Sequence, residues 1–346
     1  MNLQQIKDKL NSSEYDFLKE NEHLGDNIIL LTIGGSYAYG TNIDTKDYVS
    51  DLDIKGIALN KKDEILLGKN FEQVDDRSTD TVIYGFNKII KLLTNCNPNT
   101  IELLGGRPDY YFYRSKIGDE LINNSKLFLS KKAAYTFGSY AGSQLYRLNQ
   151  KAAHQMSQSE LEKHILKTLE FMQTDFTKKY TPYSDDSMKL YIDKAVQEGY
   201  NTEIFMDVNL AHYPLRDYCS MWNELQNTVR QYGKIGKRNE KAIEHGKIAK
   251  HSMHLIRLYM MCLDILEKER IITYREDEHD LLMDIRNGKY LDSNDQPIPE
   301  FFEMVNDYEK RLDYAKKNTN LPDNPDYKKI NEFVASVNER VVKGEI

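Results

Sequence analysis

Hydrophobic positions in the N-terminal part of the chain follow two periodicities, and each predicts a different element. The continuous apolar run at 27–33 is typical of a buried strand. Alternation over 51–59 indicates a half-buried strand, and residues 80–84 form a third strand-like segment. Apolar residues recur at helical spacing in 3–20 and 85–95, so each segment is expected to form an amphipathic helix.

From about residue 118 the hydrophobic pattern becomes mainly helical. Helices are expected at 131–151, 158–177, 187–198, 216–230, 238–268 and 302–316. One segment, 203–210, alternates and predicts a strand. The predicted fold class is α+β, in which a small mixed sheet with helices occupies 1–117 and a mainly helical domain occupies 118–346.

The first predicted strand ends in Gly34-Gly35-Ser36, and a short helix that ends at Gly40 is expected to follow. A strand that ends in Gly-Ser and opens a helix exposes backbone N–H groups, and these donors favour a bound phosphate. Glycine lets the backbone approach the phosphate without a clash from a Cβ atom. Gly35 and Ser36 are therefore candidate nucleotide-binding residues.

Two acids, Asp51 and Asp53, begin the second predicted strand. Because residues i and i+2 of a strand point to the same face, their carboxylates lie side by side and repel each other unless a cation lies between them. Such hard oxygen ligands suit Mg²⁺, or Mn²⁺, shared with substrate phosphates. Nucleotidyl transfer needs a third carboxylate as metal ligand or base, for which Asp80 is the candidate and Glu102 the alternative.

Three residues of the segment 238–268 have the spacing of one helical stripe. Lys250, His254 and Arg257 lie at i, i+4 and i+7, so they could face a triphosphate across a cleft, and we take them as candidate nucleotide-binding residues. An ordinary charged helix face is the alternative. The same spacing occurs at Tyr140, Gln144 and Arg147.

Two further motifs have a structural interpretation. Asn97-Pro98-Asn99 is typical of a helix stop with an Asx-turn. Arg286 and Gly288 are typical of a helix C-terminus.

The motifs follow one another in an order that resembles a known family. They are Gly35-Ser36-x-Ala38-Tyr39-Gly40, Ser50-Asp51-x-Asp53-x-x-Gly56, Asn97-Pro98-Asn99-x-x-Glu102-Leu103-Leu104, Lys250-x-x-x-His254-Leu255-Ile256-Arg257-Leu258 and Leu282-x-x-Ile285-Arg286-x-Gly288. In this order they resemble the RNA-repair-associated (RlaP-type) nucleotidyltransferases of the DNA polymerase β superfamily. The resemblance spans roughly residues 27–290.

The resemblance implies roles for the residues that match. In that superfamily the glycine-serine pair holds a nucleoside triphosphate, and an Asp-x-Asp pair with a later acid binds two divalent metal ions. It therefore implies a polymerase-β-like catalytic domain with Asp51, Asp53 and Asp80 as catalytic metal ligands. The helical domain is expected to close the cleft for nucleotide and acceptor. Tyr37 departs from the pattern, because relatives commonly have a basic or polar residue after the serine.

The expected activity is transfer of a nucleoside monophosphate from an NTP to a hydroxyl acceptor, with release of pyrophosphate. The resemblance favours an RNA end as acceptor. The net charge is −7, which argues against broad non-specific binding of nucleic acid. A protein or a small molecule therefore stays an alternative acceptor, as in toxin–antitoxin or phage-defence transferases.

Two other function classes remain as hypotheses. A degenerate transferase could sense a nucleotide without chemistry. A serine hydrolase would use Gly34-x-Ser36-x-Ala38, which approximates a nucleophile elbow but lacks its last glycine. The three cysteines have no CxxC spacing and the apolar run at 28–33 is too short to cross a bilayer, so we expect a cytoplasmic protein without a membrane partner.

Overall fold

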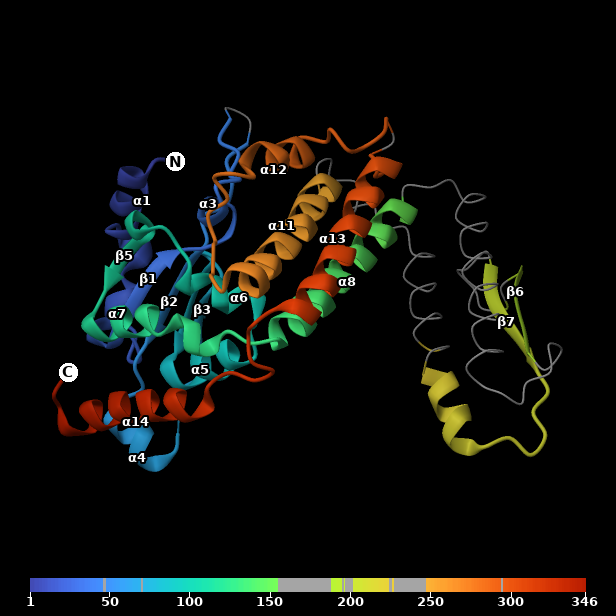
Figure 1. The fold of residues 1–346 in the computed structure, drawn as a ribbon. Coiled ribbons are helices and arrows are strands. Elements are labelled where there is room, and N and C mark those ends of the chain that lie inside the picture. The colour runs from blue at the N-terminus through green and yellow to red at the C-terminus, as the bar shows by residue number, and fades with distance from the viewer. Residues whose placement is uncertain are drawn as a thin grey trace. The chain divides into compact units, whose positions relative to one another are not determined.

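The computed structural model describes residues 1–45, 48–69, 71–154, 188–194, 196, 202–223, 226, 247–293 and 295–346. The chain forms two compact units, drawn in Figure 1. The first contains Met1–Tyr146, Ala249–Asp292 and Pro297–Ile346, and the second contains Arg147–Ile248 and Ser293–Gln296. The first unit thus holds the whole of 1–117 together with much of 118–346. The functional boundary between residues 117 and 118 stays a prediction.

The first unit is built on a five-stranded sheet in the order β3-β4-β2-β1-β5. β2 and β4 are parallel, and the other neighbours are antiparallel. The strands are β1 (Ile28–Ile33), β2 (Ile54–Ala58), β3 (Gln73–Asp76), β4 (Thr81–Gly85) and β5 (Tyr111–Arg114). The three predicted strands are confirmed as β1, β2 and β4. The edge strands β3 and β5 were not predicted, because Gln-Val-Asp-Asp and Tyr-Phe-Tyr-Arg are too short and too polar to show a clear pattern.

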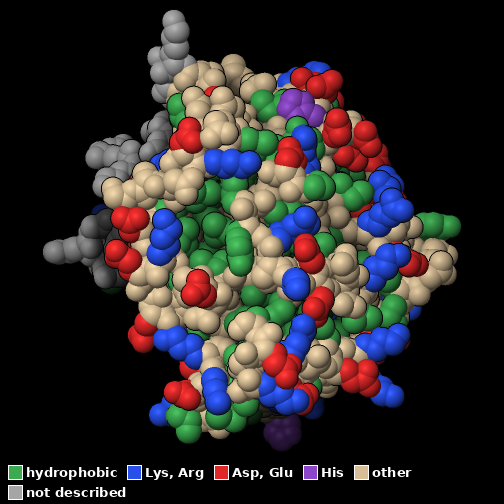
Figure 2. Space-filling view, turned by 90° about the vertical axis from the view of Figure 1, so that its left-hand side faces the viewer, with side chains coloured by type: hydrophobic (Ala, Val, Ile, Leu, Met, Phe, Trp, Pro, Cys, Tyr) green, Lys and Arg blue, Asp and Glu red, His purple; other side chains and the backbone are tan. Residues whose placement is uncertain are grey.

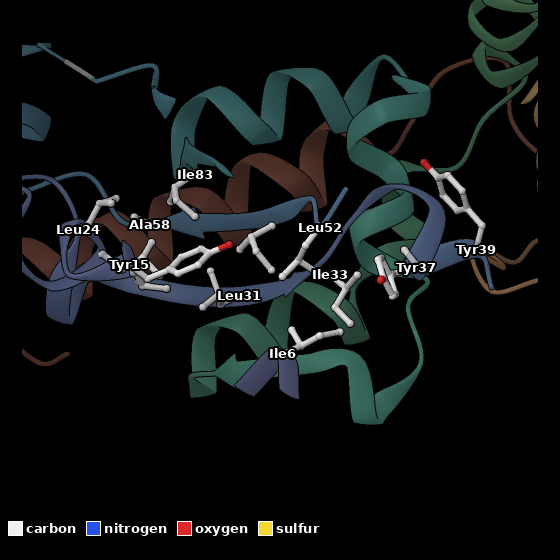
Figure 3. Close-up of a cluster of buried hydrophobic side chains, with 14 residues drawn as sticks. Ile6, Tyr15, Leu24, Leu31, Ile33, Tyr37, Tyr39, Leu52, Ala58 and Ile83 are labelled. Carbon is white, nitrogen blue, oxygen red and sulfur yellow. The ribbon is translucent and has the colours of Figure 1, made fainter. Parts of the chain in front are cut away.

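β1 lies inside the sheet between β2 and β5, and all six of its residues are buried. A strand covered on both faces is a continuous apolar run, which is why 27–33 carries no polar alternation. Figure 3 shows Leu31 and Ile33 of this strand packed with Leu52 and with Ile6 of α1. The same cluster includes Tyr37, whose hydroxyl donates to Asp44 at 2.8 Å.

Helices surround this sheet and extend from it within the first unit. They are α1 (Leu3–Leu10), α2 (Phe17–Glu20), α3 (Gly35–Tyr39), α4 (Lys62–Leu67), α5 (Phe86–Thr94), α6 (Pro98–Ile101), α7 (Lys116–Asn123), α8 (Lys132–His154), α11 (Lys247–Lys268), α12 (His279–Arg286), α13 (Pro299–Asn318) and α14 (Tyr327–Lys343). α8 continues past Tyr146 into the second unit. The predicted fold class, a mixed sheet with helices followed by a mainly helical region, is confirmed.

The single helix expected over 3–20 is wrong, because α1 ends at Leu10 and α2 begins at Phe17. The side chain of Asn11 donates to the carbonyl of Lys7, and that of Ser12 donates to the carbonyl of Lys9. Asn and Ser compete with the helix for backbone hydrogen bonds, which favours a helix end at this point.

The long helices α8, α11 and α13 run side by side (Figure 1), and aromatic side chains join α11 to each of the other two. The rings of Tyr140 and His254 join α8 to α11 at 6.1 Å between centroids, and Tyr259 and Tyr308 join α11 to α13 at 6.0 Å. The helices predicted at 131–151 and 302–316 are confirmed, and so is the described part of 238–268. α14 was not predicted.

The described part of the second unit contains a hairpin of β6 (Met188–Lys194) and β7 (Thr202–Val208), with Met188 opposite Val208. The strand predicted at 203–210 is confirmed, whereas the helix predicted at 187–198 is wrong. Apolar residues there alternate with polar ones, and Tyr191 stacks across the hairpin on Phe205 at 5.8 Å. Residues 216–223 are helical as predicted, and the helix expected at 158–177 lies outside the described residues.

Figure 2 shows the side of the molecule that carries the N-terminal helix. Lysine and arginine side chains are interspersed with acidic ones around a hollow in which hydrophobic side chains gather. A cavity of about 710 Å³ lies between α1 and β5 and is lined by Lys7, Leu10, Phe112 and Tyr113 among others. The charges that Figure 2 displays on this face form no extended basic surface of the kind that non-specific nucleic-acid binding uses. None of the described helices combines the length and the apolar character needed to span a bilayer.

Candidate active site

The turn Gly34-Gly35-Ser36 leads from the end of β1 into α3, as predicted. Gly35 has a φ of 58°, a conformation that favours glycine, and α3 ends at Gly40 with a φ of 75°. The backbone N–H of Gly34 donates to the carbonyl of Asp53 at 2.8 Å. This hydrogen bond fixes the turn beside the residue that precedes β2.

The carboxylate of Asp53 lies directly against this turn. A Cβ atom built on Gly35 would overlap the Oδ2 atom of Asp53, so the space next to the acid exists only because residue 35 has no side chain. The acid and the Gly-Ser turn therefore lie side by side in the structure.

Asp51 and Asp53 precede β2 rather than lying on it, since the strand begins at Ile54. The alternation expected of a strand nevertheless extends to them: Asp51 is exposed, Leu52 is buried in the core and Asp53 is half-buried. The two carboxylates line the same pocket, as their i, i+2 spacing predicted.

Asp80 lies at the same edge of the sheet because β2 and β4 are parallel. Ile54 is opposite Thr81, so Asp53 and Asp80 occupy corresponding positions just before their strands. The backbone N–H of Ile54 donates to the carbonyl of Asp80 at 3.1 Å. Burial raises the pKa of Asp53, and the negative charges of Asp80 and Asp51 raise it further against the opposing effect of Lys55 and Lys250. The three acids are thus electrostatically coupled.

A pocket of about 450 Å³ brings these residues together with helices α8, α11 and α12. It is lined by Gly35, Ser36, Tyr39, Ser50, Asp51, Asp53, Asp80, Gln144, Lys250, His251, Met253, His254 and Arg286. Every candidate site residue in the first 100 positions therefore lies in one pocket, and so do two of the three predicted on α11. Tyr140 does not line the pocket but packs against the His254 ring, and the side chain of Arg147 lies outside the described part.

Glu102, the alternative third carboxylate, is committed to a buried network beside the pocket. It is 4% exposed and accepts hydrogen bonds from Tyr39 at 2.8 Å and from Lys55 at 2.7 Å. Arg257 reaches it at 3.4 Å. Burial would raise the pKa of Glu102, but Lys55 and Arg257 outweigh it and hold this pKa below its usual range.

Arg257 was expected to contact the nucleotide, but the structure places it in this network and outside the pocket lining. Its side chain is 1% exposed, and the guanidinium lies 3.5 Å from the centre of the Tyr39 ring. It also lies 3.1 Å from the Nδ1 atom of His254. Lys250, one turn before His254, is exposed and lines the pocket.

His254 is a neutral ring with a defined tautomer. An arginine can only donate, so Nδ1 of His254 accepts from Arg257 and the proton of the neutral ring is on Nε2. Burial lowers the pKa of His254 to about 2, and the positive charges of Arg257 and Lys250 act in the same direction. The residue therefore presents a neutral N–H donor in the wall of the pocket.

The acids fit a divalent cation that is shared with a ligand. Among the described side chains, no group of three His, Cys, Asp or Glu is arranged to hold a metal ion by itself. Mg²⁺ is usually bound through one or two carboxylates and the phosphates of a substrate. The raised pKa of Asp53 comes mainly from burial, and Asp80 and Asp51 add to it through repulsion that a cation would relieve.

A mixed sheet, a Gly-Ser turn that opens a short helix and a set of acids at the adjoining sheet edge together define a polymerase β-like nucleotidyltransferase. The RNA repair pathway DNA polymerase β family, RlaP, matches residues 3–336, so the chain belongs to this family. No curated protein and no solved structure matches the chain.

The sequence analysis did not name His251, Met253 or Arg286 as residues of the site, although all three line the pocket. Arg286 was interpreted as part of a helix C-terminus, and α12 does end there, with Gly288 following at a φ of 85°. Its side chain nevertheless lines the pocket. The signal that could have found it is its place in the Leu282–Gly288 motif, in which it is the one charged residue among the matched positions.

Proposed function

We propose that the chain transfers the nucleoside monophosphate of a nucleoside triphosphate to a hydroxyl acceptor and releases pyrophosphate. The observation that carries the proposal is the position of the Asp53 carboxylate against Gly35, because it puts the acids and a phosphate-binding turn in one pocket. The family, described as an RNA repair pathway family, supports an RNA end as acceptor.

The chain itself supplies several groups for an anionic polyphosphate. The first N–H groups of α3 have no side-chain cap, since the N-cap residue is Gly34. We assign these N–H groups and the Ser36 hydroxyl to the phosphates. Lys250 contributes a cation and His254 a neutral donor from α11, and Arg257 holds the His254 ring in position.

Asp51, Asp53 and Asp80 would hold Mg²⁺ or Mn²⁺. When bound, the ions would neutralise charge on the phosphates and lower the pKa of the acceptor hydroxyl. We choose Asp80 over Glu102 as the third acid because Glu102 is neutralised by Lys55 and Arg257. Asp80 is exposed, so it can also accept the proton of the acceptor.

The test is incorporation of radiolabelled nucleotide into RNA with Mg²⁺ or Mn²⁺, with release of pyrophosphate measured in parallel. Asp51→Asn and Asp53→Asn should each lower the transfer rate by at least about 10³-fold, because each removes charge that the transition state requires. Asp80→Asn should lower it by about 10²-fold or more.

Asp75→Asn is the control, since Asp75 is an exposed acid of β3 that does not line the pocket. All four variants should unfold at the temperature of the wild type within a few degrees. Full activity of Asp53→Asn would refute the proposal. If a protein or a small molecule is labelled instead of RNA, the assignment of RNA as acceptor is wrong, but the assignment of nucleotidyl transfer is supported. Nucleotide binding without pyrophosphate release would instead identify a nucleotide sensor.

A further inference from the structure

Arg286 is a buried cation whose hydrogen-bonding capacity is only partly used. It is 7% exposed, and its Nε and one terminal nitrogen have no hydrogen-bond partner among the described residues. Burial lowers the pKa of its guanidinium, and the Tyr48 hydroxyl is the group that opposes this effect. Arginine keeps its charge even so, and a buried charge without a counter-ion is unfavourable.

Arg257 and Arg275, the two more deeply buried arginines, differ from Arg286 because each has a carboxylate partner. Arg257 pairs with Glu102, and Arg275 pairs with Asp264 and donates to the carbonyl of Ile272 at 2.7 Å. Arg286 has no such carboxylate within the described residues, although it lines the same pocket as Asp51. The charge missing from its surroundings can therefore come from a ligand in that pocket.

We infer that Arg286 binds a phosphate group of the substrates in this pocket. The planar guanidinium, with several N–H donors, matches phosphate oxygens in both charge and geometry. The inference rests on the proposed function, which brings two phosphate sources to the pocket: the triphosphate of the nucleotide and the terminal phosphate of an RNA acceptor. Arg286 is then a binding residue supplied by α12, separate from the Gly-Ser turn and from the α11 stripe.

The experiment compares Arg286→Gln and Arg286→Lys with the full-length wild type by equilibrium binding. The ligands are ATP with Ca²⁺, sodium tripolyphosphate, and one oligoribonucleotide with and without terminal phosphates. Arg286→Gln should weaken binding of the phosphate-bearing ligand about 10- to 100-fold, the usual loss when a hydrogen bond to a charged group is removed. Arg286→Lys keeps the positive charge but loses the planar guanidinium, so its affinity should lie between those of Arg286→Gln and the wild type.

Thermal unfolding separates binding from a structural role. Because Arg286 is an unpaired buried charge, ligand-free Arg286→Gln should unfold at the wild-type temperature or above it, while its stabilisation by ligand is reduced. Arg275→Gln is the structural comparison and should unfold at a lower temperature. Arg311→Gln, which alters a more exposed arginine paired with Glu267, is the control for loss of one positive charge.

The ligands also identify the source of the phosphate. Losses for ATP and tripolyphosphate assign Arg286 to the nucleotide, and a loss confined to the terminal phosphates of the oligoribonucleotide assigns it to the acceptor; either supports the inference. Unchanged binding of every ligand, or destabilisation equal to that of Arg275→Gln, would overturn it. The wild type could also transfer no nucleotide and still bind tripolyphosphate in a way that depends on Arg286. That result would contradict the proposed function and still support the phosphate site.

Discussion

Two groups of charged side chains lie close together in the first unit, and they differ in whether their charges are compensated. In the buried network, Glu102 is matched by Lys55 and Arg257 and is hydrogen-bonded by Tyr39. At the acidic edge, burial and the two acidic neighbours Asp80 and Asp51 raise the pKa of Asp53, and the positive charges of Lys55 and Lys250 offset this only in part.

This difference separates charges that stabilise the fold from charges that are available to bind a ligand. A compensated buried pair needs nothing further, and its role is to hold segments together. Asp53 lies against Gly35 and close to other acids, so it is suited to bind a cation. Arg286 is buried and has no carboxylate partner among the described residues, so it is suited to bind an anion. Mutations in each of the two groups can test whether this distinction holds.

The largest effect is expected for Glu102→Ala, which leaves Lys55 and Arg257 without their carboxylate. Removing one partner of a buried ion pair should lower the free energy of unfolding by about 3–5 kcal/mol. Asp80→Asn, at an exposed position, should change it by less than about 0.5 kcal/mol. Urea unfolding followed by circular dichroism measures both.

Lys55→Met combined with Glu102→Leu is the comparison for the network, because it removes two opposite charges at once and leaves one cation, Arg257, without its carboxylate instead of two. The double variant should lose less stability than Glu102→Ala if the loss comes from uncompensated charge. Equal losses for Glu102→Ala and Asp80→Asn would contradict the distinction between the two groups.

The sequence predicted the features whose causes are local. The apolar run of β1, the Gly-Ser turn that ends it and the i, i+2 spacing of Asp51 and Asp53 are all set by neighbouring residues. The structure has the strand and the turn as expected, whereas Asp51 and Asp53 precede β2, and the roles of the residues remain predictions. The hairpin of β6 and β7 shows the limit even for local signals, because a short amphipathic segment at 188–194 fits both periodicities when its strand partner is unknown.

Charge compensation could not be predicted, because the partners are far apart in sequence. Nothing near Glu102 shows that Arg257 will neutralise it, since the pairing depends on how α11 packs beside the turn after α6 that carries Glu102. Arg257 and Arg286 are both charged residues of helices, and both belong to motifs on which the family resemblance rests. Only the packed structure shows that Arg257 has a carboxylate partner and that Arg286 has none within the part of the chain that the structure describes.

A smaller effect on stability, with a large effect on activity, is expected for Gly35→Ala. Its φ of 58° strains any other residue by about 1–2 kcal/mol, and the new methyl group must also displace the Asp53 carboxylate. Gly68→Ala is a matched control, because Gly68 has a φ of 65° and a Cβ atom there meets nothing within 4 Å.

The two alanine variants should therefore separate strain from displacement of the acid. Both should lose comparable stability in urea unfolding, with Gly35→Ala the worse of the two. Only Gly35→Ala should lose nucleotide transfer, by on the order of 10²-fold, in the radiolabel assay. Equal transfer by both variants would mean that Asp53 does not need its position against the turn.

The smallest effect concerns the pH dependence of stability through His254. Burial lowers its folded-state pKa to about 2, whereas an unfolded histidine has a pKa of about 6.5. Below pH 6.5 the unfolded chain takes up a proton that the folded chain does not, so stability falls as the pH falls, by up to about 1.4 kcal/mol between pH 7.5 and 5.5.

His254→Asn should remove this part of the slope, and His279→Asn, at a side chain that is 42% exposed, should leave it unchanged. Urea unfolding at pH 7.5, 6.5 and 5.5 measures the slope. A slope that is the same in His254→Asn and in the wild type would show that the ring is protonated in the folded protein, and the neutral donor assigned to the pocket wall would then be wrong.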